Sequence, residues 1–263
     1  MKALIIGNKG AYGSWLTRRL ENNFGENCVF GTEKDSVDPI EILVPEFQVI
    51  INCASMSASR KVIEEVVAVI SSDSLIIDLT TSKKEVGPIL NSAVCDVVMI
   101  HPMSAPPENN SPLTDDVKVS VICEKINNPE NYRWYTDFCL LFGGVREEIS
   151  FERHNQREDI VQSVPHLLLV TFGEAVANSG FTLDEVEQMA TPVSKPLCQA
   201  LRRHFSKGNA DTFAELQRLA DRSIEKPMGT VTDRIRLFDW LAKSDHSDFL
   251  SFDWKKIKGK LGL

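Results

Sequence analysis

The sequence lacks several features that would place it in a specialised class of protein. Its six cysteines are scattered, with no CxxC pair and no spacing typical of a zinc site, so we expect small buried apolar side chains and no metal centre. Basic residues are fewer than acidic ones, and the net charge of -8 argues against a nucleic-acid partner, which calls for a basic surface. The only basic run of the sequence consists of Lys255, Lys256, Lys258 and Lys260. We interpret it as the solvated end of a helix.

Long apolar runs and targeting signals are also missing. The sequence shows no charged leader followed by an apolar core, and no apolar stretch approaches about twenty residues, the length of a membrane-spanning helix. We therefore expect a cytoplasmic protein without a membrane contact. The 263 residues are 43% apolar and 25% charged, which is ordinary for a soluble globular chain and sufficient for one large domain or two modest ones.

The first thirty-five residues carry a motif for dinucleotide binding. An apolar run, Leu4 to Ile6, predicts a strand, and the helical spacing of apolar residues from Ala11 to Asn23 predicts a helix. The turn between them consists of Gly7, Asn8, Lys9, Gly10, Ala11, Tyr12 and Gly13. In such a turn glycine lets the backbone approach a ligand, and the helix start offers free N–H groups to a pyrophosphate.

The glycine frame is imperfect, because a strict GxGxxG pattern would place its first glycine at Asn8. A plain strand-turn-helix with glycines for chain geometry therefore stays open as an alternative. A second predicted strand, Cys28 to Phe30, leads to Glu33, about twenty residues beyond the turn, where a carboxylate binds the ribose hydroxyls of NAD. Glu33 should repel a 2'-phosphate and favour NAD, whereas Thr32 and Lys34 soften that preference, so NADP stays open.

The rest of the first half alternates apolar strands with amphipathic helices. This pattern predicts an α/β fold, a Rossmann-type doubly wound and mostly parallel sheet covered on both faces. From residue 151 the pattern turns helical, which predicts a dinucleotide-binding domain over 1–150 and an all-helical domain over 151–263. The predicted strands are Phe47 to Cys53, Ser74 to Asp78, Val97 to Ile100 and Val117 to Cys123; the main helices are Ser59 to Ile70 and Pro129 to Phe142.

Polar residues follow three of these strands, at the sheet edge where ligands bind in such folds. Small residues, among them Ala54 and Ser55, could admit the nicotinamide end of a cofactor. The stretch from Asp78 to Lys84 holds three hydroxyls and two ammonium groups, and His101 opens a proline-containing loop. Taken singly, the last two motifs also fit a helix N-cap with solvated lysines and a stiffened loop with an incidental histidine.

A predicted helix from 152 to 178 places His154, Glu158, Gln162 and His166 on one stripe. Pro165 should kink or divide this helix, because proline removes a backbone hydrogen bond. His166 lies in an apolar run, where an imidazole is either a satisfied core group or a cleft residue. Helices predicted over 211–224 and 230–243 are amphipathic and could pair with a second copy of the chain.

Together these motifs resemble the prephenate and arogenate dehydrogenases, which oxidatively decarboxylate prephenate-type ring acids. The resemblance rests on the glycine turn, on the Asp-Leu-Thr-Thr-Ser-Lys stretch of 78–83, on His-Pro-Met at 101–103 and on the spacing of the helical histidines. It implies NAD, or NADP, as cofactor, a ring-acid substrate, a cytoplasmic homodimer and no metal. It also implies His101 as the catalytic base with Thr81 and Lys83 beside it, and substrate contacts from His154, His166 and Lys195. Arg202 or Arg203 stays open as the ligand of the substrate carboxylate in place of Lys195.

The sequence departs from the family pattern in several places. Lys195 stands where relatives carry an arginine for the substrate carboxylate, and Ser104-Ala105-Pro106 replaces the family's Phe-Gly-Pro. These changes suggest a substrate other than prephenate, such as arogenate or 4-amino-4-deoxyprephenate. Two alternatives stay open: another nicotinamide-linked hydroxyacid or imino-acid reductase, and a non-catalytic nucleotide-binding dimer.

Overall fold

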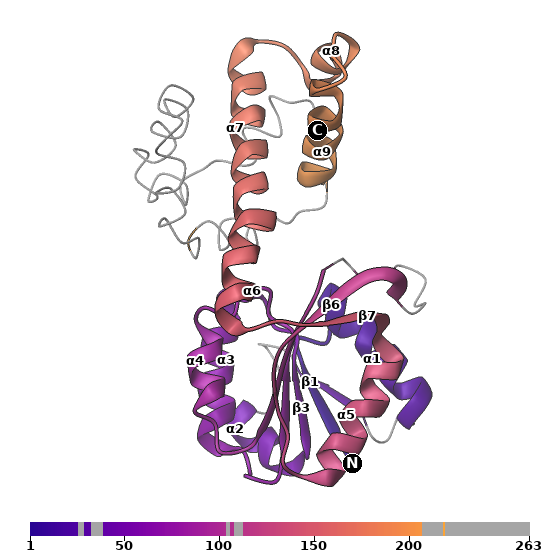
Figure 1. Cartoon of the computed structure of the whole chain (residues 1–263), viewed down its shortest axis with the longest axis vertical. Helices are drawn as coiled ribbons and strands as arrows, with labels where there is room; N and C mark the ends of the chain where they lie inside the picture. Colours follow the sequence, from indigo (N-terminus) through magenta and orange to yellow (C-terminus); the bar gives the residue numbers. More distant parts are fainter. Residues whose placement is uncertain (26–28, 33–38, 104–105, 108–112, 207–217, 219–263) are drawn as a thin grey trace. The chain divides into compact units, whose positions relative to one another are not determined.

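The structure is a computed structural model that describes residues 1–25, 29–32, 39–103, 106–107, 113–206 and 218 (Figure 1). Expectations for Glu33, Lys34, Ser104, Ala105, the helices beyond residue 210 and the C-terminal lysine run lie outside the described residues. The chain forms two compact units, Met1–Asn155 and Gln156–Leu263.

The first unit contains a sheet of strand order β2-β1-β3-β4-β5-β6-β7. The first five of these strands are mutually parallel, β6 runs antiparallel to β5, and β7 is parallel to β6. This topology confirms the predicted Rossmann-type, mostly parallel sheet. The strands are β1 (Ala3–Ile6), β2 (Val29–Thr32), β3 (Val49–Asn52), β4 (Leu75–Asp78), β5 (Asp96–Pro102), β6 (Leu113–Lys125) and β7 (Gly143–Glu148).

Helices cover both faces of this sheet (Figure 1). Strands β1, β3 and β4 are buried at every position, because their apolar residues face helices on either side. One face packs against α1 (Ala11–Phe24) and α5 (Pro129–Phe142). The other face packs against α2 (Ile40–Leu43), the short 3-10 turn η2 (Val44–Glu46), α3 (Met56–Val69) and α4 (Val86–Asn91).

A continuous series of aromatic rings joins α1 to α5. Trp15 meets the ring of Phe142 edge to face, with 5.2 Å between the ring centroids. Such contacts add to the stabilisation that ring burial gives. The series therefore fixes α1, which begins in the glycine turn, against α5. It runs from Tyr12 through Phe142, Phe138 and Trp134 to Phe24, with centroid separations of 6.4, 5.4, 5.7 and 5.3 Å.

The loop before α5 is held by one carboxylate. Asp96 accepts hydrogen bonds from the backbone N–H groups of Asn127 at 2.8 Å and Asn128 at 3.0 Å, and from Asn131 Nδ2 at 2.9 Å. Burial alone would raise the pKa of the Asp96 carboxyl, but these hydrogen bonds outweigh burial and hold that pKa below its ordinary value. The carboxylate thus ties the start of β5 to the start of α5.

The described residues beyond β7 are helical. The ring of Phe151, the first residue of α6 (Phe151–Glu158), packs against Gly87 of α4. A Cβ at Gly87 would lie 2.1 Å from Phe151 Cε2. A π-helical turn, η3 (Asp159–Ser163), then precedes α7 (Val164–Ser179). The helical segment thus continues through Pro165, with the π-helical turn directly before it, where proline has no N–H for the carbonyl four residues earlier. Two further helices, α8 (Leu183–Gln188) and α9 (Ser194–Ser206), complete the described chain.

One helix bears on the expectation that the chain has no membrane-spanning segment. Within the described part of the chain, the 29-residue helical segment Phe151–Ser179 is long and apolar enough to cross a membrane, with a mean hydropathy of 1.4 in its best window. Length and composition alone are weak evidence, because interior helices of soluble proteins also pass this test. The sequence shows no unbroken apolar run there, because Gln162, His166 and Glu174 interrupt it.

Candidate functional site

The glycine turn is shaped by close backbone approaches. Gly7 has a φ of 85°, and a Cβ there would lie 2.7 Å from the carbonyl oxygen of Cys53, which directly follows β3. A Cβ at Gly13 would lie 2.0 Å from Gly7 O, so α1 can approach the turn only with glycine at this position. The first turn of α1 reads Ala-Tyr-Gly-Ser and has no acidic side chain, which leaves its N–H end suited to an anion.

The other residues of the turn have different environments. Asn8 packs against β2, since a Cβ at Gly31 would lie 1.8 Å from Asn8 Nδ2. Lys9 and Ala11 are exposed. The ring of Tyr12 stacks on Phe142 and so faces α5.

A cavity of about 830 Å³ opens beside this turn. Of the residues predicted to bind a cofactor, Gly7, Gly10, Ala54 and Ser55 line it. The cavity lies beyond the carboxyl ends of β1 and β3, and Gly7 and Gly10 form part of its wall, so the residues present fit a dinucleotide. Thr32, Glu41, Lys61 and Glu65 line the remainder together with apolar side chains.

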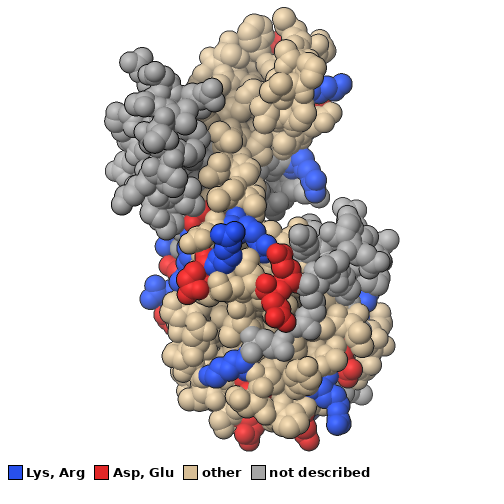
Figure 2. Space-filling model, viewed as in Figure 1, with Lys and Arg blue, Asp and Glu red and all other residues tan. Residues whose placement is uncertain are grey.

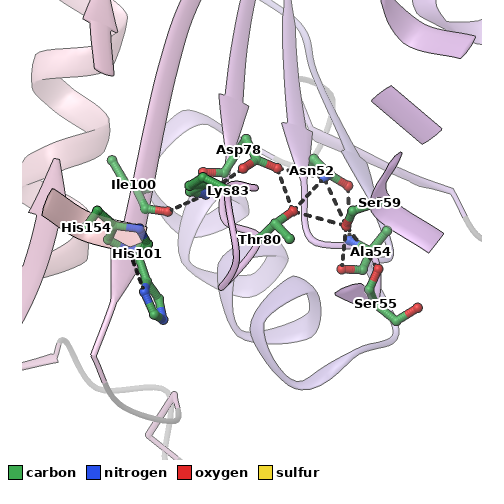
Figure 3. Close-up of polar contacts among 10 residues, drawn as sticks. All are labelled: Asn52, Ala54, Ser55, Ser59, Asp78, Thr80, Lys83, Ile100, His101 and His154. Carbon is green, nitrogen blue, oxygen red and sulfur yellow. Dashed lines mark hydrogen bonds and ion pairs between the residues drawn. The ribbon is translucent and has the colours of Figure 1, made fainter. Parts of the chain in front are cut away.

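A buried set of polar groups crosses the ends of β3 and β4 (Figure 3). Asn52 Nδ2 donates to Asp78 Oδ1 at 2.8 Å, and Thr80 Oγ1 lies 2.7 Å from the same oxygen. Thr80 Oγ1 is also 3.0 Å from Ser59 Oγ, and Ser59 donates to the carbonyl of Ser55 at 2.9 Å. Each of these carboxamide, carboxylate and hydroxyl groups thus finds partners inside the protein.

Lys83 extends this set to β5. Its side chain is fully buried, and Nζ donates to Asp78 Oδ2 at 2.5 Å, to Asp78 O at 3.1 Å and to Ile100 O at 3.0 Å. An ammonium group has three protons, and the three acceptors use all of them. Thr81, two residues earlier, is half-buried.

The residue after Ile100 is the predicted base. His101 is 4% exposed, and its Nδ1 lies 3.0 Å from Nε2 of His154 on α6, which is 1% exposed. The structure thus brings together two histidines that are 53 residues apart in sequence (Figure 3). Because Nδ1 of His101 faces a second imidazole, Nε2 is the nitrogen of this ring to consider for proton transfer.

The remaining predicted substrate residues belong to the second unit. His166 is half-buried on α7, and Lys195 is exposed in the first turn of α9. Arg202 Nη2 donates to Asp184 Oδ1 at 2.5 Å and to Glu187 Oε2 at 3.0 Å, which joins α9 to α8. These hydrogen bonds raise the pKa of Arg202, with Asp184 the main cause.

Some members of the site were not assigned from the sequence. Asn52 and Ser59 were missed, although an asparagine that closes an apolar strand is itself a signal of a buried polar partner. Cys53 lies beside them, half-buried on the wall of the cavity, and desolvation raises the pKa of its thiol far above the ordinary value, with a further rise from the Asp78 carboxylate.

Charged side chains are mixed over the surface. Figure 2 shows basic and acidic residues interspersed on the visible face of the described residues.

Comparison with known proteins gives the following matches. No family model matches the chain. A curated protein of Methanocaldococcus jannaschii, named probable arogenate/prephenate dehydrogenase, is 23% identical over 228 residues. The match covers 81% of this chain and 50% of the relative, so the chain spans about half the length of that protein. The chain is similar to arogenate and prephenate dehydrogenases. This confirms the resemblance inferred from the sequence.

Solved structures show the same fold. A prephenate dehydrogenase of Aquifex aeolicus, in complex with hydroxyphenyl propionate and NAD+, superposes with a TM-score of 0.60 at 16% identity and covers 95% of both chains. Synechocystis arogenate dehydrogenase superposes with a TM-score of 0.62 at 13% identity, over 95% of this chain and 96% of its own. At these identities the likeness establishes the fold, and activity has to be argued from the site.

Proposed function

We propose that the protein catalyses the oxidative decarboxylation of a prephenate-type ring acid, with NAD, or NADP, as the hydride acceptor. The observation that carries this proposal is the buried His101–His154 pair at the end of β5, in the same unit as the dinucleotide-type cavity. The match to the arogenate/prephenate dehydrogenase of M. jannaschii supports the choice of reaction. Prephenate, arogenate and 4-amino-4-deoxyprephenate are the candidate substrates.

His101 is the proposed base for the ring hydroxyl. In the tautomer that suits this role, Nδ1–H donates to His154 Nε2, and the lone pair of His101 Nε2 accepts the hydroxyl proton. Protonation then makes the bond between the two rings charge-assisted and stronger. Bound NAD would accept the hydride from the carbon that bears the hydroxyl, or the amino group in 4-amino-4-deoxyprephenate, where His101 would take an N–H proton instead. Loss of the ring carboxylate as carbon dioxide makes the ring aromatic, and the proton held by His101 returns to the oxygen or nitrogen on the ring.

Lys195 is the proposed ligand of a substrate carboxylate. Arg202 already donates to two carboxylates of α8, whereas Lys195 is an exposed cation at the start of α9. His166 and Thr81 are proposed to contact the substrate as the family resemblance implies. We expect Lys195→Ala to raise the KM for the ring acid about tenfold, equivalent to about 1.4 kcal/mol, and Arg202→Ala to lower stability instead.

The deciding experiment follows the absorbance of reduced nicotinamide. Purified protein is mixed with NAD or NADP and with each of the three candidate acids. Turnover with one acid, reduced by roughly 10²- to 10⁴-fold in His101→Asn, supports both the reaction and the base. The matched control is His204→Asn, the same exchange on α9, which should keep the activity of the native protein.

Other outcomes would favour the alternatives. Turnover only with a hydroxyacid or imino acid would indicate a different nicotinamide-linked reductase. Tight NAD binding without any turnover would indicate a nucleotide-binding protein that lacks catalysis. Comparable rates on prephenate and on both analogues would count against a specialised substrate.

The second unit is proposed to form a homodimer of a cytoplasmic protein. Several of its large apolar side chains are exposed, which calls for a covering partner. In buffer without detergent, we expect sedimentation equilibrium to give the mass of a dimer. A monomer, or a protein found only in membranes, would contradict this. The exposed residues are Ile160, Val161, Leu168, Phe181, Met189, Val193 and Leu197.

A further inference from the structure

The polar groups at the ends of β3, β4 and β5 are buried more deeply than stability requires. Asp78 and Lys83 are both 0% exposed, and Thr80 is 5% exposed. A buried ion pair loses much of its attraction to the cost of leaving water, and apolar residues of the same volume often stabilise a fold as well. Stabilisation is therefore a poor account of why charge is placed here, and control of geometry is a better one.

The two ends of this set meet different parts of the candidate site. At one end, Asn52 Oδ1 accepts from Ala54 N at 3.2 Å and Ser59 donates to Ser55 O at 2.9 Å, so the loop that lines the cavity is held. At the other end, Lys83 donates to Ile100 O at 3.0 Å, directly before His101. Asp78 joins the two ends through its separate carboxylate oxygens (Figure 3).

We propose that Lys83 and Thr80 are positioning residues, which act through Asp78 to hold His101 in a fixed relation to the cavity loop. This inference rests on the proposed function for its kinetic consequences. Lys83 has no proton left for a substrate, because all three are donated to protein oxygens. A displacement of about 1 Å between reacting groups can cost on the order of 10²-fold in rate.

Two changes break the set without leaving a buried charge unpaired. Thr80→Val removes one hydroxyl and keeps the side-chain shape. The double variant Asp78→Asn with Lys83→Met removes both charges and keeps an apolar chain of similar length. Thr80→Ser restores the hydroxyl, and Thr136→Val makes the same exchange at an exposed hydroxyl on α5, which bonds only to Tyr132 O at 2.9 Å among the hydrogen bonds described.

In kinetics, we expect Thr80→Val and the double variant to lower kcat by about 10- to 100-fold, with the KM for NAD changed less than about threefold. The primary deuterium isotope effect on kcat should rise, because hydride transfer becomes rate-limiting. Thr80→Ser should recover most of kcat, and Thr136→Val should match the native protein. A purely structural role would lower the denaturation midpoint and leave both kcat and the isotope effect of the folded protein unchanged, which would overturn the proposal.

A second readout does not depend on turnover. In ¹⁵N-histidine NMR spectra, the His101 signals, assigned by their loss in His101→Asn, should show one fixed tautomer in the native protein and in Thr136→Val. In Thr80→Val and the double variant they should broaden or report mixed tautomers. Unchanged His101 signals in folded variants would refute the positioning role. If the native protein turns over none of the acids while the signals respond, the proposed function fails and the positioning role stands.

Discussion

Gly31→Ala on β2 is expected to disturb the glycine turn through Asn8. The added Cβ would lie 1.8 Å from Asn8 Nδ2, 2.3 Å from Asn8 Cγ and 2.8 Å from Asn8 Cβ, so the whole Asn8 side chain has to move away. Overpacking of this kind costs about 1–3 kcal/mol, a factor of roughly 5–150 in the folding equilibrium.

The cause can be isolated with a double-mutant cycle. In Asn8→Gly the obstructing carboxamide is absent, so Gly31→Ala should cost little there, with a coupling energy of about 1 kcal/mol or more. Gly13→Ala is the control, because its Cβ would meet the backbone atom Gly7 O at 2.0 Å, which Asn8→Gly leaves in place. Urea denaturation followed by tryptophan fluorescence measures each cost. Costs of Gly31→Ala that agree within about 0.5 kcal/mol in both backgrounds would refute the reasoning.

Three further outcomes are expected. Asp96→Asn should destabilise the protein by about 1–3 kcal/mol at pH 7. Because the pKa of Asp96 is lowered in the folded state, its contribution to stability is present above the unfolded pKa and is lost as the pH falls through the folded pKa. Urea denaturation should therefore show a smaller difference in stability between the native protein and Asp96→Asn in acid than at pH 7. Gly87→Ala should displace Phe151 and cost about 1–3 kcal/mol in the same assay, and Phe151→Leu should relieve it. Burial raises the pKa of Cys95 to about 11, so mass spectrometry should find this thiol unmodified by iodoacetamide at pH 8, and rapid labelling would contradict its burial.

The sheet was predictable from local patterns. Leu4 to Ile6 and Leu75 to Ile77 are apolar throughout, which is typical of parallel strands buried on both faces, and the structure has β1 and β4 there. The helix Pro129 to Phe142 was predicted with the bounds of α5. Short α8 was not predicted, although Thr182 and Glu185 form a capping box at its start.

The partners within the site were less accessible from sequence. The motif containing Thr80 and Lys83 was visible, but the sequence cannot tell a lysine that reaches a ligand from one whose protons are donated to Asp78 and Ile100. Likewise Arg202 was a candidate for a substrate carboxylate because its charge was visible and its bonds to α8 were not. Such pairings depend on long-range packing, which residue spacing alone does not encode.

The aromatic series between α1 and α5 has a consequence for protein engineering. Tyr12 in the glycine turn stacks on Phe142, which lies more than a hundred residues away at the end of α5. The glycine turn therefore cannot be transferred alone into another protein. A chimera that imports the first strand, turn and helix from a relative has to import the matching α5 as well, or the turn will be grafted onto rings that do not fit it.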